Sequence, residues 1–180
     1  MVKKTPIALL GVILAVSGCS TMTPARYSVS VDNNMALKSY QGSTMDIVSI
    51  GAPEKYDSSC RMMGPIQASD GQTIPQFVNK AFNDEFKFAG VYGDGGAKLT
   101  GRLDKIAFSS SAGLTNGWWD LALTLSSANG QSMSVENKYD FKSGFDAITA
   151  CNQTAQALGP AVQDLIKKTV TDPRFKSLLR

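Results

Sequence analysis

Carboxylates and cysteines are the side chains here that could do chemistry, because the 180-residue chain contains no histidine. Without an imidazole, the chain lacks Ser-His-Asp and Cys-His nucleophilic systems and every His-containing metal site. Asp84 and Glu85 are adjacent on a predicted helix, so their carboxylates do not face one another. Asp104 and Asp120 fall on predicted strands whose relative placement stays open. We identify no catalytic residue, metal site or cofactor and expect the protein not to be an enzyme; the alternative is a wall hydrolase acting through carboxylates.

The N-terminus has the layout of a bacterial secretory signal. Lys3 and Lys4 precede an apolar run of ten residues, 7–16, which small residues follow. About 20 helical residues are needed to cross a bilayer, so this run is too short to span one. We therefore expect residues 1–18 to be a cleaved signal peptide.

The signal ends in Val16-Ser17-Gly18-Cys19, which resembles the lipobox of bacterial lipoprotein precursors. The resemblance implies that the Cys19 thiol receives a diacylglycerol, that cleavage falls before Cys19, and that the new amine can take a further acyl chain such as palmitate. Several acyl chains on one residue anchor a protein stably to a membrane. The alternative is an ordinary cleavage site that happens to precede a cysteine.

Position 20 carries the sorting information in such precursors. In enteric-type Gram-negative bacteria an aspartate there favours the inner membrane, so by the same resemblance Ser20 implies the outer membrane, with the protein facing the periplasm. Residues 19–26 would form the lipidated tether, whose seven residues after Cys19 reach at most some 23 Å. Residues 27–180 would form a single domain.

Two cysteines, Cys60 and Cys151, remain after lipidation of Cys19. An exported protein meets an oxidising compartment, so we predict a disulfide between them. It would close a loop of about 90 residues and contribute about 2 to 4 kcal/mol. A redox pair is the alternative, but the spacing is not that of a CxxC motif.

The charge balance argues against a nucleic-acid partner. Removing Lys3 and Lys4 with the signal reduces the 18 basic residues to 16, against 15 acidic ones. Basic residues form no run beyond Lys167-Lys168, so the electrostatic footprint of a nucleic-acid-binding protein is missing.

The first half of the mature chain predicts two strands and one helix. Alternation predicts a half-buried strand over 27–31, and 45–50 reads as a more buried one. Thr73 and Gln76 have the spacing of a capping box, which predicts a helix of about 16 residues ending at Gly90.

The second half predicts three strands and a long helix. A strand from Ala97 should contain a bulge near 104–105, where the apolar positions change parity. Residues 109–117 read as a flexible loop. Pairing of Leu125 with Met133 and Leu123 with Val135 would leave a three-residue loop, 128–130, with Gly130 at positive φ.

The C-terminal helix should begin after Asp146, and its Gly159-Pro160 pair should kink or break it near residue 158. Together the elements predict an α+β two-layer sandwich, a mainly antiparallel sheet of about five strands with two main helices on one face. This arrangement looks like that of small Gram-negative outer-membrane lipoproteins, such as the lipopolysaccharide-assembly and curli-secretion groups. No diagnostic residue of either group is matched, so the resemblance assigns no site.

These features favour a non-enzymatic accessory, scaffold or assembly lipoprotein that binds another envelope component through an exposed sheet face or the loops 54–72 and 109–118. Strand alternation turns Trp119 inward and Trp118 outward, which makes Trp118 the candidate interface residue. Its alternative role is to cover a sheet edge or lie under the loop.

The alternative function is binding of a lipid or small ligand between the sheet and the helices. The candidate lining is the apolar helix face with Phe77, Phe82 and Phe86, for which core packing is the other reading.

Overall fold

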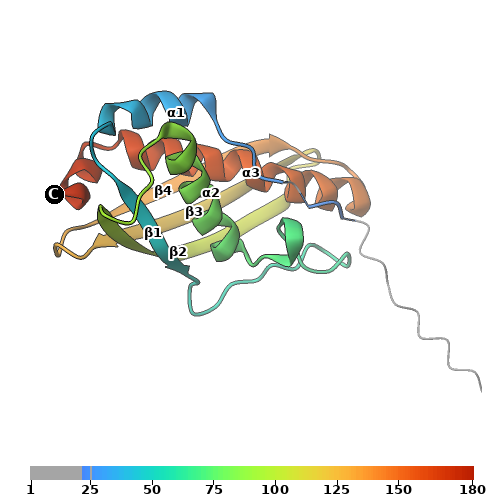
Figure 1. Ribbon diagram of the computed structural model, residues 1–180. Helices are drawn as coiled ribbons and strands as arrows, with labels where there is room; N and C mark the ends of the chain where they lie inside the picture. Colours follow the sequence, from blue (N-terminus) through green and yellow to red (C-terminus); the bar gives the residue numbers. More distant parts are fainter. Residues whose placement is uncertain (1–21, 25) are drawn as a thin grey trace, which may run out of the picture.

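Four strands form one mixed sheet, and the helices pack against one of its faces (Figure 1). The computed structural model describes residues 22–24 and 26–180, so the predicted signal peptide, Cys19 and Ser20 lie outside the described residues. The strands are β1 (Met45–Gly51), β2 (Ala97–Ala112), β3 (Asn116–Ser127) and β4 (Ser132–Lys142). The helices are α1 (Val31–Leu37), α2 (Ile74–Ala89) and α3 (Ala147–Thr171), with short 3-10 turns at Lys38–Tyr40, Ser69–Gly71 and Pro173–Leu179.

The sheet order is β1-β2-β3-β4. Strands β1 and β2 are parallel and are joined through α2, whereas β2, β3 and β4 form an antiparallel meander. The predicted α+β two-layer architecture is confirmed, with four strands rather than about five. The parallel pairing of β1 with β2 was not predicted, because it depends on the return of the chain through α2.

The predicted strand over 27–31 is wrong. Ser30 instead caps α1, and its side chain accepts a hydrogen bond from the Asn33 backbone. The segment before it is extended but has no strand partner, and Tyr27 packs edge-on against Phe77 of α2 at 5.9 Å. Of the alternating apolar residues only Tyr27 packs on the helices, since Val29 and Val31 are exposed, so the alternation does not mark a buried side here.

Helix α2 has the predicted ends and length. Thr73 and Gln76 form the capping box, and Gly90 ends the helix at φ 74°. Phe77, Phe82 and Phe86 are at most 1% exposed and belong to the core. The Phe-rich face therefore packs as core between the helices and the sheet.

The meander has the predicted register. A shift between Leu103 and Lys105 marks the bulge, and Leu125 pairs with Met133. Gly130 has φ 86° and donates its backbone N–H to Ser127 at 3.0 Å, which confirms the three-residue loop. The prediction of a flexible loop over 109–117 is wrong, because β2 continues to Ala112 and β3 begins at Asn116. Small polar residues are tolerated there for two reasons. Backbone hydrogen bonds between β2 and β3 hold the hairpin, and alternate side chains point to the uncovered side of the sheet.

Helix α3 begins after its predicted cap, Asp146, and runs as one helix across Pro160. Of the kink or break predicted near residue 158, the break does not occur. Pro160 is exposed, while its neighbours Gly159 and Ala161 are buried against the rest of the domain. Packing of the residues on both sides of the proline holds the helix together. The carbonyl four residues before Pro160, which loses its backbone hydrogen bond, lies on the solvent side.

Candidate interaction surface

The face of the sheet that none of the described helices covers is the candidate interaction surface, and we call it the open face. Its central strand, β3, alternates between two environments. The inward residues are buried to within 1% exposure: Trp119, Leu121, Leu123 and Leu125. The outward residues are only partly buried: Trp118, Asp120, Ala122, Thr124 and Ser126. Because every helix lies on the inward side (Figure 1), the outward row faces solvent.

Trp118 lies on β3, an inner strand of the open face, close to the end at which this strand begins. It pairs with Ser109 of β2 on one side and Asp140 of β4 on the other. The Lys138 ammonium lies 5.6 Å from the centre of the indole ring. Trp119 points the opposite way and donates its ring N–H to the Thr154 carbonyl at 2.9 Å. The predicted orientations of the two indoles are confirmed, and the alternative of an indole covering a sheet edge is excluded.

Four charged side chains of the open face form two ion pairs. Lys105 forms an ion pair with Asp120, and this hydrogen bond and the negative charge raise the pKa of Lys105 above its ordinary value. Arg102 forms an ion pair with Asp104 at 2.6 Å. Asp104 and Asp120, whose placement was open, thus share a face but each has its own cation. They do not form a pair of carboxylates aimed at one substrate.

Hydroxyl groups connect the strands between these charges. Thr124 donates to Asp104 at 2.5 Å, and its oxygen lies 2.7 Å from the Ser134 hydroxyl. The open face is therefore polar, with two ion pairs and linked hydroxyl groups, and Trp118 is its large aromatic side chain.

A hollow of about 450 Å³ lies beside Trp118, where the sheet ends. Lys142 on its rim donates to Asn116 at 3.1 Å. Phe141 packs directly on Gly117, where any Cβ would come within 2.5 Å of the ring. The lining residues are Ala112, Asn116, Gly117, Asp140, Phe141 and Lys142.

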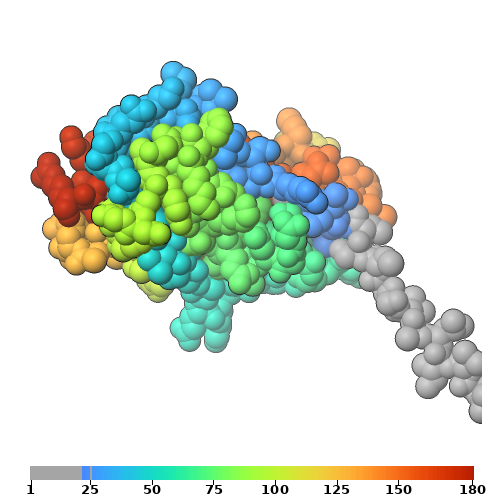
Figure 2. Space-filling model, in the orientation of Figure 1, coloured from blue at the N-terminus to red at the C-terminus, as the bar shows by residue number. Residues whose placement is uncertain are grey.

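The predicted disulfide between Cys60 and Cys151 is present, with the Cα atoms 5.9 Å apart. It ties the loop that follows β1 to α3. Within the loop, Ser59 and Pro65 form a short bridge, and Arg61 donates to the Ser110 hydroxyl at 3.2 Å. The stretch 52–58 projects from the surface (Figure 2). Most of the loop proposed as an alternative interface is thus held against the domain.

The prediction missed a buried carboxylate, Glu85, which is 0% exposed. Its Oε1 accepts hydrogen bonds from the Tyr27 hydroxyl at 2.6 Å, the Ser30 backbone at 2.8 Å and the Asn33 amide at 3.1 Å. Burial and the bond to Glu85 raise the pKa of Tyr27 above its ordinary value. The cluster joins the N-terminal segment to α2.

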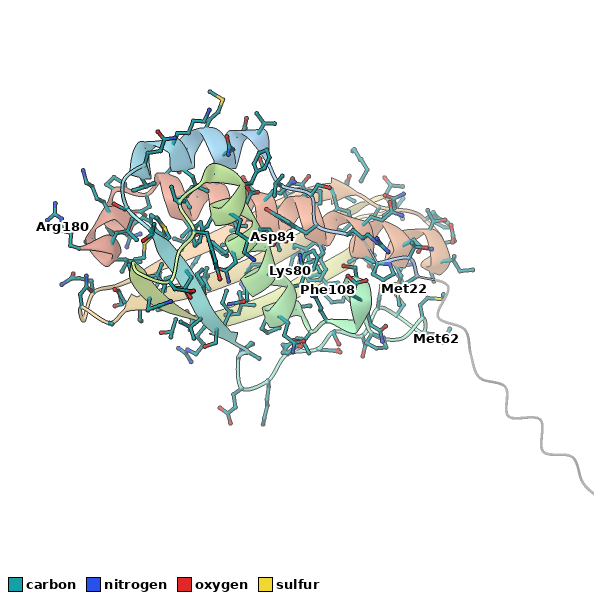
Figure 3. The ribbon with its side chains drawn as sticks, viewed as in Figure 1. Met22, Met62, Lys80, Asp84, Phe108 and Arg180 are labelled. Atoms are coloured by element: carbon teal, nitrogen blue, oxygen red, sulfur yellow. A yellow bond between two sulfur atoms is a disulfide. The ribbon has the colours of Figure 1, made fainter. Side chains whose placement is uncertain are left out.

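A signal for Glu85 was present in the sequence. It lies four residues after Ala81 and three after Phe82, on the apolar side of the helix, whereas Asp84 points outward and pairs with Lys80 (Figure 3). A carboxylate on an apolar helix face must find hydrogen-bond donors when it is buried.

The described part of the chain, residues 22–24 and 26–180, holds no helix with the length and apolar character to cross a membrane. Within the same residues, Asp, Glu and Cys side chains form no group of three that could bind a metal ion.

No protein-family model matches the sequence, and no curated protein matches it. Among solved structures, the fold is similar to that of protein XCC0632 from Xanthomonas campestris, whose crystal structure is described under the family model DUF330. The TM-score is 0.53 at 13% identity, over 86% of this chain and 96% of the other. At this identity the likeness supports the fold alone.

Proposed function

We propose that the protein is a lipid-anchored envelope lipoprotein that binds another envelope protein through the open face of its sheet. Its role is accessory, as a scaffold or assembly factor, and involves no catalysis. Acyl chains on Cys19 hold it to the outer membrane, with the domain on the periplasmic side. The observation that carries this proposal is that the described helices cover one face of the sheet and leave the other face uncovered. Trp118 lies on that uncovered face, on the inner strand β3.

The size of the open face suits a protein partner. Four strands about 4.8 Å apart and on average about 11 residues long, at about 3.4 Å per residue, give an area of roughly 700 Å². A stable protein interface buries about 800 Å² on each partner. An aromatic anchor surrounded by polar groups with satisfied hydrogen bonds is a common arrangement for the energetic centre of such an interface.

Crosslinking in cells tests the partner. A photoreactive amino acid in place of Ala122, in the same outward row of β3 as Trp118, should capture a discrete envelope protein. The added substitution Trp118→Ala should abolish that product. The matched control places the same amino acid at Met35, which is exposed on α1. Absence of a product from Ala122, or equal products with and without Trp118, would contradict binding through the open face.

Mass spectrometry of native material tests the anchor. We expect a mature N-terminus at Cys19 with the added mass of its acyl chains, and release of the Cys19→Ser protein from membranes. An unmodified Cys19 would contradict the anchoring half of the proposal and leave the crosslinking result to decide the other half.

A further inference from the structure

The packed domain begins close to the proposed lipidation site. Met22 is 8% exposed and belongs to the core, and the Thr23 backbone donates to the Asn152 side chain of α3 at 3.0 Å. Only three residue steps separate Cys19 from Met22, a reach of at most about 11 Å. Met22 lies at the same end of the molecule as Met62, whereas Arg180 lies at the opposite end (Figure 3).

The end that contains Met22 also carries the three most exposed large apolar side chains of the described residues, and a fourth that is about half exposed. Met62 is 99% exposed, Phe145 76% and Leu114 74%, and Ile148 is 53% exposed. We call these four residues the apolar end.

The four residues come from separate segments that the fold brings together. Cys60, two residues before Met62, is bonded to Cys151, one turn after Ile148. The backbone N–H of Ser143 donates to Thr115, beside Leu114, at 2.9 Å.

The turn that carries Met62 is held in place on both sides. Arg61 adopts a left-handed conformation at φ 51°, and the Cys60 backbone donates to Gly64 at 2.8 Å. The Arg61 guanidinium reaches the Phe145 carbonyl at 3.4 Å. A non-glycine residue in this conformation is unfavourable, yet the fold keeps Arg61 there and points Met62 into solvent.

We propose that the apolar end lies in the interfacial layer of the bilayer that anchors the protein. The inference rests on the proposed lipidation of Cys19, because acyl chains there would bring the membrane within about 11 Å of Met22. Apolar side chains at a membrane surface enter it by about 5 to 10 Å. Val31 and Met35 are also exposed, but they lie on α1, away from Met22 (Figures 1 and 3).

This contact would fix the orientation of the domain. Strand β3 begins at the apolar end, and α3, with 25 residues, extends away from it for about 37 Å. Trp118 is the third residue of β3, so the open face would present its indole to a partner close to the membrane plane.

A fluorescence experiment on the lipidated full-length mature protein in phosphatidylcholine vesicles tests this orientation. The variants Leu114→Cys and Phe145→Cys carry an environment-sensitive fluorophore, and Met35→Cys, 66% exposed, is the matched control. We expect blue-shifted emission and about twofold quenching by nitroxide-labelled acyl chains at Leu114 and Phe145, and neither effect at Met35.

The outcomes separate the two proposals. If the protein is bound to vesicles but the fluorophores at Leu114 and Phe145 both report water, the membrane contact is overturned. The proposed anchor and partner would be unaffected by that result. An unmodified Cys19 would overturn the anchor and this inference together. Labels in lipid combined with no crosslinked partner would support the membrane contact and contradict only partner binding.

Discussion

The two faces of the sheet show what the fold requires and what it leaves free. On β3, Trp119 is fully buried and its ring N–H has a backbone partner, whereas the adjacent Trp118 is partly exposed beside Lys138. Both indoles occupy the same strand and differ only in the face they point to. The covered face holds the domain together, so its residues should govern stability, while Trp118 is free to serve binding.

The largest effect should come from the covered face. Trp119→Ala should lower the free energy of unfolding by about 3 to 5 kcal/mol, because it empties a filled core position and leaves the Thr154 carbonyl without its side-chain donor. Urea unfolding followed by far-UV circular dichroism measures this loss. A loss below about 1 kcal/mol would contradict the division between the two faces.

Removing the disulfide should have the next largest effect. Cys60 and Cys151 are 91 positions apart, and opening a loop of that length should cost about 2 to 4 kcal/mol. The double variant Cys60→Ala/Cys151→Ala, compared with the oxidised protein in urea, measures this difference. An equal urea midpoint for the two proteins would show that the bridge adds nothing to the packing of the covered side.

Features that depend on neighbouring residues could be predicted from the sequence. The Thr73 capping box, the pairing of Leu125 with Met133 and the opposite directions of the two indoles each follow from short-range patterns, and the structure has all three. Short segments without a recognisable partner strand were harder to predict. Alternation over 27–31 does not distinguish a strand from a segment that lies along a helix and contacts it through Tyr27.

Contacts between distant segments could not be predicted in the same way. Three features depend on how the chain returns through space: the parallel pairing of β1 with β2, the donors around Glu85, and the gathering of the segments that carry Met62, Leu114 and Phe145 at one end. No local periodicity encodes these contacts, so the apolar end was found only in the structure. An exposed sheet face, in contrast, follows from the predicted two-layer arrangement.

The covered side should also contain a pH-sensitive contact. The pKa of Tyr27 is raised in the folded protein by burial and by its bond to Glu85. Above pH 10 the unfolded chain loses the Tyr27 proton while the folded protein keeps it, so stability present below pH 10 should fall as the pH rises. The slope for one group is about 1.4 kcal/mol per pH unit.

The variant Tyr27→Phe isolates this contribution. At pH 7 it should be less stable by about 1.5 kcal/mol, because a hydrogen bond to a carboxylate is lost. Between pH 10 and 11 the difference from the parent protein should shrink, since the variant has no phenol to ionise. Unfolding curves at pH 7, 10 and 11 would reveal the trend, and a constant difference across them would argue against the raised pKa.

The smallest effect on stability should come from the open face. Trp118→Ala removes a partly exposed ring and its contact with Lys138, which at an exposed site is worth about 0.5 to 1 kcal/mol. We expect a loss of no more than about 1 kcal/mol in the same urea assay used for Trp119→Ala. Lys138→Met is the matched control, because it removes the cation and keeps the ring.

If Trp118→Ala approached the cost of Trp119→Ala, the indole would belong to the packing of the domain. Loss of a crosslinked partner in that variant could then be explained by unfolding. A small cost makes such a loss evidence for recognition, because the strand, its register and the covered face all remain in place.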